Sequence, residues 1–418
     1  MIRVKIGNDS RTLEQWRASS ASLMLNSFGA DTFTMSVSAL RWQSAAFPEN
    51  TRVEVYNNDR RIFLGLLNDP TAQCHATSAD EVSISAKGLW SILESTPYQN
   101  TWINEIVPGS PLTAIYDKTK AQIFGHKTNY VATGNGGVTQ SDSMVKLYSA
   151  NEFVTADVIP VYNSKVAKKL FNIEVSDGDF ASSTVLPYEE KQFAVFSDIF
   201  SAIAKWHPEL VSWYDYHLAV PVLRIKAPEN VARSNVDYGS IMECSVSQKR
   251  ASRPSQICLR VAKKAKTTIS VGAGWVSAAY VNSTNYVYPE GADIYAGNTL
   301  QIAFDMSDTD TTQGAQVNYN GVLAQIVAMT MRDAVTGSVK LVDEDFSKRY
   351  VATRLNILNS PDKLENIDAI VQSEQIDLST GERTLTLNND NSPDVFDYVD
   401  RIKYMVENAK YGTKVAIE

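Results

Sequence analysis

The sequence predicts a β-rich α+β protein of several domains, with two small antiparallel β-barrels, mixed α+β insertions and a C-terminal helix. Three observations lead to this prediction: short runs alternating apolar and polar residues in both halves of the chain, helical spacing between them, and a length of 418 residues. One hydrophobic core stops growing at roughly 250–300 residues, so two to four domains are expected.

The first barrel is predicted over residues 1–98. Residues 2–6 and 33–37 alternate aliphatic with polar side chains, the pattern of strands with one buried face. The cluster Asn57-Asn58-Asp59 predicts a turn before a returning strand, and a further alternating run ends at Gly88. Five or six short strands at this spacing indicate a small barrel or sandwich.

Residues 99–210 are predicted to form a mixed α+β domain. Ser110-Pro111 is a cap followed by proline, and the apolar spacing after it predicts a helix to Thr119. A second helix is predicted from Phe193 to Trp206, ending before Pro208. The glycines of 131–140 indicate a flexible loop.

The second barrel is predicted over 211–277 and 313–390. Strands are expected at 213–216, 223–225 and 257–261, then at 317–322 and 326–331, with a turn over 333–338, a strand at 339–341 and a last hairpin over 376–387. The polar stretch 278–312 is interpreted as a surface insertion. The segments 62–88 and 322–342 resemble each other weakly as hairpins, and chance similarity explains this equally well.

The last predicted element is a helix within residues 391–418. Ser392 caps it, Pro393 opens it, and an apolar stripe runs from Val395 to Val406, with Gly412 beyond. Its polar face carries charges of both signs, so the helix could pack on this chain or on a neighbour.

The composition is that of an ordinary globular protein, 44% hydrophobic and 21% charged, so no long segment must stay unfolded. The apolar runs fall short of the roughly 18 residues that a membrane helix needs, and no membrane segment is expected. The first residues lack the apolar core of a secretory signal, so the chain is expected to fold where it is made. Three widely spaced cysteines, Cys74, Cys244 and Cys258, are expected to be reduced and buried.

The net charge of −8 gives no overall attraction for nucleic acid. One basic cluster stands out, formed by Lys249, Arg250, Arg253, Arg260, Lys263, Lys264 and Lys266. It lacks the interleaved aromatic residues of a nucleic-acid site. We interpret it as a solvated strand face, with a contact to an acidic subunit as the alternative.

The sequence predicts no catalytic, cofactor-binding or metal-binding residues. The four histidines, His75, His126, His207 and His217, lack zinc-ligand spacing, and the adjacent Cys74 and His75 would point to opposite faces of a strand. No Gly-x-Ser-x-Gly occurs, and neither Gly272-Ala-Gly274 nor the glycine run 134–137 completes a nucleotide-binding motif. Acidic pairs are too numerous to interpret. Trp206, Trp213, Tyr214 and Tyr216 could form a sugar platform, but core packing is the favoured interpretation.

Several of these strand patterns follow one another in an order known from one protein family. They are Ala21–Leu25 with Asp31–Val37, Arg52–Tyr56, Ile62–Gly65, Val82–Leu89, Trp213–Tyr216 with Pro221–Ile225, Arg250–Val261 and Ile376–Gly381. This order resembles the baseplate hub of contractile-tailed phages and the related late-control and tail-tip hub proteins. The resemblance covers most of the chain, and segment 278–312 has no counterpart in it.

The resemblance implies a homotrimer in which each chain offers two barrel-like tube domains, so that six similar units surround a channel. Such a ring joins a six-fold tail tube to a three-fold spike. The implied partners are the tail tube protein, a spike or tail-tip protein and a tape measure protein. The resemblance also implies a virion tail protein assembled in the host cytoplasm, and an acidic channel that DNA passes without specific binding.

Two other functions are open at this point. A tail-associated cell-wall or polysaccharide hydrolase would show turnover that disappears when one acidic residue is replaced. A host-adhesion β protein would bind host cells through residues 278–312. Whether the tail is contractile, non-contractile or part of a DNA-free injection system is equally open.

Overall fold

The computed structural model describes a large part of the chain, and the fold is given for that part. The described residues are 1–38, 47–68, 71–73, 81–98, 105–106, 114–115, 126–132, 138–144, 154–165, 170–175, 194–206, 210–227, 231–248, 254–271, 274–293, 298–306, 319–330, 335–360 and 369–388. Within them, no helix is both long and apolar enough to cross a membrane.

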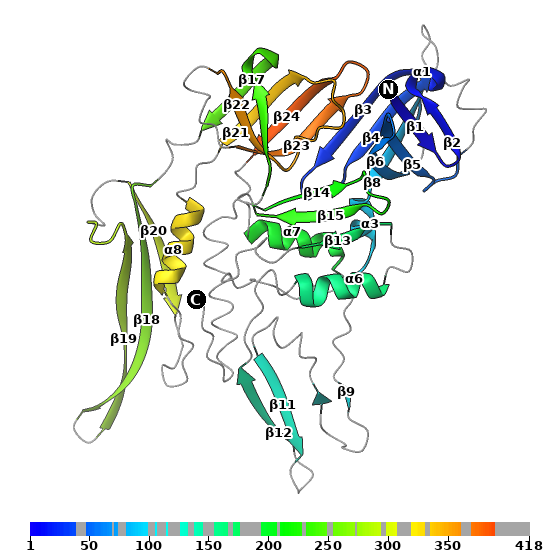
Figure 1. Ribbon diagram of the computed structural model, residues 1–418. Coiled ribbons are helices and arrows are strands. Elements are labelled where there is room, and N and C mark those ends of the chain that lie inside the picture. The colour runs from blue at the N-terminus through cyan, green and yellow to red at the C-terminus, as the bar shows by residue number, and fades with distance from the viewer. Residues whose placement is uncertain are drawn as a thin grey trace.

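The largest element is a 14-stranded sheet built from both ends of the chain (Figure 1). Its N-terminal β module consists of β1 (Ile2–Ile6), β2 (Asp9–Thr12), β3 (Ala18–Asn26), β4 (Thr32–Ser38), β5 (Arg52–Asn57), β6 (Arg60–Leu67), β7 (Thr71–Gln73) and β8 (Glu81–Gly88). Its C-terminal β module consists of β16 (Arg233–Asp237), β17 (Ile241–Gln248), β21 (Val335–Val342), β22 (Arg354–Leu358), β23 (Ala369–Asp377) and β24 (Glu382–Asn388). The strand order along the main path is β17-β21-β24-β23-β3-β4-β8-β6-β5-β1-β2.

The two modules are joined by direct strand pairing. Strand β23 of the C-terminal module runs antiparallel to β3 of the N-terminal module, with Glu374 opposite Leu25 and Ile376 opposite Leu23. All four of these side chains are buried. The hydrogen-bond ladder therefore continues from one module into the other without a break.

The sheet of the N-terminal module is strongly curled. The rings of Phe33 on β4 and Phe63 on β6 lie 6.0 Å apart, although β8 separates these strands in the sheet order. The short helix α1 (Leu13–Trp16), with a capping box between Thr12 and Gln15, contacts both β1 and β3. The buried Trp16 indole donates to the Val4 carbonyl at 3.0 Å. The curled sheet of the module has the shape of a half-barrel, with β2 at its open end.

A second layer packs against this module. It contains the three-stranded sheet β13 (Asn172–Glu174), β15 (Val222–Lys226) and β14 (Val211–Asp215), with α3 (Trp90–Ser95), the π-helix η1 (Val154–Val158), α6 (Ile159–Lys165) and α7 (Phe196–Trp206). The apolar residues of this layer form one continuous core with those of the N-terminal module. The C-terminal module has a core of its own, built around Val339, Tyr350 and Leu385.

The remaining elements form smaller units. A long hairpin of β18 (Gln256–Val271) and β19 (Gly274–Tyr288) pairs through β18 with β20 (Thr299–Met306), and helix α8 (Tyr319–Thr330) lies against it (Figure 1). Two further two-stranded sheets consist of β9 (Glu105–Ile106) with β10 (Ala114–Ile115) and β11 (His126–Ala132) with β12 (Val138–Met144). A 3-10 turn, Tyr238–Ser240, links β16 to β17.

The predicted fold class is confirmed: the chain is rich in curled antiparallel β structure with helices between. The strands predicted in the first hundred residues are present, and Asn58 forms the β5–β6 turn with a left-handed φ of 53°. Helix α7, strands β14 and β15 and the β23–β24 hairpin also lie where the sequence predicts them. Three strand pairs are parallel, an arrangement that the sequence analysis did not anticipate: β13–β15, β16–β22 and β18–β20.

Some predictions of local structure were wrong. Residues 319–330, which overlap the predicted strands 317–322 and 326–331, form helix α8, with Val322, Leu323 and Ile326 buried on one helical face. The weak hairpin resemblance to 62–88 therefore fails. The turn predicted at 333–338 overlaps strand β21. A helix was predicted from Ser110 to Thr119, but Ala114–Ile115 pair as a strand with Glu105–Ile106. Tertiary pairing overrode the local propensity there.

The polar stretch 278–312 contains regular structure. It lies partly in β19 and β20, and the β18–β19 hairpin crosses the predicted boundary at residue 277. Strands β14 and β15, assigned to the second barrel, belong to the separate three-stranded sheet. The remaining domain boundaries stay predictions. Of the loop predicted over 131–140, residues 131–132 and 138–140 lie in β11 and β12, whereas 133–137 and the helix within 391–418 lie outside the described residues.

Glycine at position 337 is required by a close approach between β21 and β17. Gly337 has a φ of 145°, and an added Cβ would lie 2.0 Å from the Ser245 carbonyl oxygen. Gly337→Ala should lower the free energy of unfolding by about 1–3 kcal/mol, measured by urea denaturation. Gly291 also has a positive φ, 77°, but an added Cβ would meet no atom within 4 Å. Gly291→Ala is therefore the matched control and should lower the free energy of unfolding by less than Gly337→Ala. Equal losses in the two variants would contradict the steric explanation.

Candidate functional site

In the 14-stranded sheet, one face of the seven strands from β17 to β8 (β17, β21, β24, β23, β3, β4 and β8) is lined mainly by short hydroxyl side chains. Cross-strand pairing aligns them in rows. In one row Ser85 lies opposite Thr34, and Thr34 lies opposite Ser22, with the Thr34 and Ser22 hydroxyl oxygens 2.6 Å apart. We call this the hydroxyl face, and its members are Ser20, Ser22, Thr32, Thr34, Ser36, Ser83, Ser85, Ser245, Ser247, Thr336, Ser338, Ser373, Thr384 and Thr386. It spans both modules, because Gln375 on β23 lies opposite Met24 on β3.

The hydroxyl face carries few charges, and these are of both signs. Lys340 pairs with Glu382 at 2.8 Å, and Glu243 lies opposite Lys340 on the next strand. Lys87 stands at one end, beside Thr32. Short hydroxyls hydrogen-bond water and carry no charge. Strong binding of a phosphate backbone depends on the charges of Lys and Arg. The face is therefore a hydrated surface with few cationic groups.

Behind this face, a fully buried ion pair holds the C-terminal module together. The Arg383 guanidinium donates to the Glu374 carboxylate, and neither side chain is exposed. Arg383 also donates to the carbonyls of residues 343, 345 and 348 at 3.1, 2.7 and 2.9 Å. Glu374 accepts from the backbone N–H groups of Tyr350 and Val351 at 2.8 and 3.1 Å. The pair thus fixes the loop 343–353 to the β23–β24 hairpin.

A second buried polar contact joins the N-terminal module to the second layer. The Tyr216 hydroxyl donates to the Asp31 carboxyl at 2.5 Å, and the Asn26 backbone N–H donates to its other oxygen at 2.7 Å. Burial raises the pKa of Asp31 to about 7, and the hydrogen bond from Tyr216 opposes this shift only in part. Burial and the nearby Asp31 carboxyl raise the pKa of Tyr216 well above its usual value.

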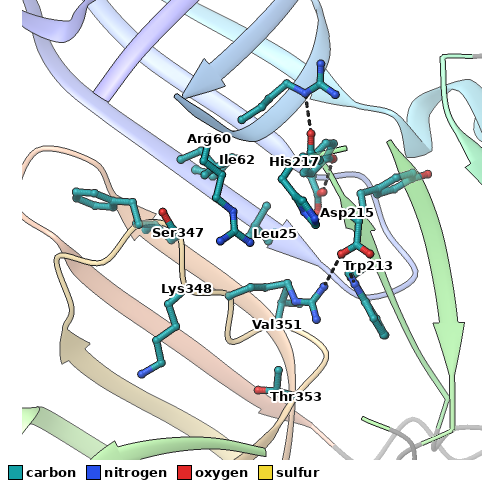
Figure 2. Close-up of a pocket in the computed structure, with 18 of the residues that line it drawn as sticks. Leu25, Arg60, Ile62, Trp213, Asp215, His217, Ser347, Lys348, Val351 and Thr353 are labelled. Carbon is teal, nitrogen blue, oxygen red and sulfur yellow. Dashed lines mark hydrogen bonds and ion pairs between the residues drawn. The ribbon is translucent and has the colours of Figure 1, made fainter. Parts of the chain in front are cut away.

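Asp31 and Tyr216 also line a pocket of about 280 Å³, which we call the junction pocket (Figure 2). It is lined by both modules and by residues 213–217. Asp215 accepts from Arg224 at 2.5 Å and from the Trp213 indole at 3.0 Å, which hold its pKa below the usual value against the effect of burial. Arg349 stacks over the Trp213 ring at 4.2 Å, and burial lowers the pKa of Arg349 to about 10.

The aromatic residues considered as a sugar platform are part of the core. Trp213, Tyr214 and Tyr216 are all buried, which confirms the packing interpretation for them, and the side chain of Trp206 lies outside the described part. Of the histidines, the structure places His217 at the junction pocket and His126 at the start of β11. His75, His207 and the first three residues of the basic cluster lie outside the described residues. The others of that cluster lie on β18, with Arg260 exposed.

The structure brings together no acidic, histidine or cysteine residues in groups of three suited to a metal ion, as far as its described residues extend. Cys258 is a buried free thiol, as predicted, and Cys244 is a half-buried one. Cys74 lies outside the described part.

The residues of the junction network could not be identified from the sequence. Asp31 and Tyr216 are 185 residues apart, and nothing in the local pattern around either of them signals the other. The hydroxyl face has a visible signal, since many polar positions of the alternating strands β3, β4 and β8 are Ser or Thr.

Comparison with known proteins gives distant structural similarities. No family model and no curated protein matches the sequence. The 43 kDa tail protein of prophage MuSo2 from Shewanella oneidensis is 8% identical, with a TM-score of 0.48, over 94% of this chain and 99% of that one. A tail protein from Neisseria meningitidis MC58 is 11% identical, with a TM-score of 0.47, over 94% and 99%. The c3393 protein of E. coli, a type VI secretion component described as similar to the T4 tail proteins gp27 and gp5, is 8% identical, with a TM-score of 0.42, over 99% and 79%. At these values no family membership follows.

Proposed function

We propose that this chain is a non-catalytic structural subunit of a phage or phage-like tail, three copies of which form a hub ring around a channel. The observation that carries this proposal is the sheet that runs unbroken through two β modules, with short hydroxyls on one face of the seven strands from β17 to β8. Three chains with two modules each would present six similar units, which suits a contact between a six-fold tube and a three-fold spike. The resemblance of the strand order to tail hubs supports the same role.

The hydroxyl face is proposed as the channel wall. A wall must not hold a passing polymer, and strong binding of DNA comes from Lys and Arg side chains that neutralise phosphates. Along this face the cations are few, and Lys340 is already paired with Glu382. The chain's net charge of −8 adds a weak general repulsion of phosphate. DNA, or another polymer, would then slide along a hydrated surface without specific contacts.

The ends of the sheet are proposed as the contacts between copies. Among the described strands, β17 and β2 stand at the two ends of the path, each paired on one side only. An open edge presents backbone N–H and C=O groups that another strand can pair. Met242 on β17 is 57% exposed, an apolar side chain suited to such a contact. A heterologous pairing of one end with the other closes into a ring under rotational symmetry.

The proposal is tested by the mass and shape of the protein in solution. Light scattering should give a mass of about 139 kDa, three times the 46.2 kDa of the chain, and negative-stain images should show an annulus. Met242→Glu should shift the mass towards that of one chain, because it places a charge at the proposed contact. Met24→Glu, on the hydroxyl face, is the matched control and should leave the trimer intact.

The alternatives give different outcomes. A hydrolase would release sugar fragments from peptidoglycan, and the proposed structural role predicts none. A chain that remains single, also when its tail tube and spike proteins are added, would contradict the ring.

A further inference from the structure

The junction pocket has an apolar wall and a polar wall. Leu25 and Ile62 of the N-terminal module and Phe346 of the C-terminal module contribute apolar side chains to its lining. Arg60 and Arg349 contribute guanidinium groups. Figure 2 shows Arg60 directed into the pocket, towards the loop that carries Ser347. The lining thus offers cationic hydrogen-bond donors beside a hydrophobic surface.

Arg349 is incompletely paired. Its nearest carboxylate is Asp215, at 3.7 Å, which is longer than a hydrogen bond. Asp215 already accepts from Arg224 and from the Trp213 indole. The Nε atom of Arg349 is buried and has no hydrogen-bond partner. A buried donor of this kind is costly unless something completes its hydrogen bonds.

The other charges around the pocket are mostly committed, which leaves a positive surplus. Arg61 donates to the carbonyls of Tyr216 and residues 218–219 and pairs with Glu54. Lys348 pairs with Asp343 at 3.5 Å. Arg60, which is exposed, forms no ion pair within the described part of the chain. In a chain of net charge −8, two arginines that line one cavity without a full set of acceptors favour an anionic ligand.

We propose that the junction pocket binds a carboxylate group carried on a short apolar stem. The carboxylate accepts hydrogen bonds from Arg349 and Arg60, since a guanidinium matches the two oxygens of a carboxylate. The stem lies against Leu25, Ile62 and Phe346. Inorganic phosphate has no stem to use this wall, so the apolar lining favours the carboxylate. Because the lining comes from both modules, the ligand would also fix one module against the other.

Calorimetric titration of the full chain tests this proposal with two probes. Glutarate represents a free small acid, and the blocked tripeptide acetyl-Ala-Glu-Ala-amide represents an acidic side chain of a neighbouring protein. At least one should bind, and the tighter of the two identifies the source of the carboxylate. Arg349→Leu and Arg60→Gln should each weaken its binding by about tenfold or more.

The control variant is Arg260→Gln. It removes an exposed arginine from β18, in a different sheet, and should leave the affinity unchanged. Arg60 is exposed, so its replacement keeps the test valid if Arg349→Leu fails to fold. The proposal is overturned if neither carboxylate binds, if inorganic phosphate binds more tightly than both, or if Arg260→Gln weakens binding as much as the pocket variants.

Discussion

Arg383→Met should lower the free energy of unfolding by about 3–5 kcal/mol, because it leaves the Glu374 carboxylate buried without its partner. Both side chains are fully buried, and Glu374 keeps only the N–H groups of Tyr350 and Val351 as donors. The variant also removes the donor that serves three carbonyls of the loop 343–348. Urea denaturation at neutral pH measures the loss.

A double variant separates the charge from the packing. Arg383→Met combined with Glu374→Leu removes both charges, and should recover a large part of the stability that the single variant loses. The loop carbonyls still lack their donor, so recovery should be incomplete. Lys340→Met is the matched control: it breaks the half-exposed pair with Glu382, and exposed pairs contribute about 0–1 kcal/mol. A double variant as unstable as Arg383→Met would show that the unpaired charge is not the cause.

Asp31→Asn should abolish a pH dependence of stability that the native chain shows between about pH 4 and pH 7. Burial raises the pKa of Asp31 from 3.8 to about 7 in the folded chain, so the folded chain holds a proton that the unfolded chain releases. The stabilising contribution of Asp31 is complete below the unfolded pKa and is lost as pH rises through the folded pKa. A shift of this size corresponds to on the order of 4 kcal/mol.

The variant keeps the shape and the hydrogen bonds of the native side chain. The Asn oxygen can accept from the Asn26 N–H, and the Asn amide can donate to the Tyr216 hydroxyl, which serves as donor or acceptor. Urea denaturation should therefore give similar stability for both chains near pH 4 and a more stable variant near pH 8, about one unit above the folded pKa.

Asp237→Asn is the control for the sign of this effect. Asp237 is exposed, and hydrogen bonds from the Gly239 N–H and the Asn359 amide lower its pKa. The stabilising contribution of the Asp237 carboxylate is present above its unfolded pKa and is lost as pH falls through its folded pKa. This pH dependence is opposite in direction to that of Asp31. A parallel pH profile for the native chain and Asp31→Asn would show that Asp31 is not the buried acid that titrates.

Much of the fold could be predicted because alternating apolar and polar residues indicate a strand with one face packed against a core. Ile2, Val4 and Ile6 are buried as their spacing predicts, and so are Leu385 and Leu387 in the last hairpin. Helix α8 could not be predicted in the same way. Its apolar residues are nearly continuous, and a short apolar run does not separate strand from helix by periodicity alone.

The candidate site could be predicted only where it follows strand periodicity. The hydroxyls of Thr34 and Ser36 could be read from the sequence, because they occupy the polar positions of an alternating strand. The junction pocket depends on Asp31, Asp215 and Arg349, which meet only when β3 pairs with β23 and residues 213–217 pack between the modules. No local pattern encodes such a meeting.

The sequence by itself determined the fold class, the positions of most strands and the resemblance to tail hub proteins, because these depend on residues near one another in the chain. Only the tertiary structure decided that the two modules share one sheet and that the half-buried Arg349 lacks a full set of acceptors beside Trp213. The physical reason is that burial and electrostatic pairing depend on distance in space, and segments far apart in the chain approach only when the hydrophobic cores and the β3–β23 ladder form.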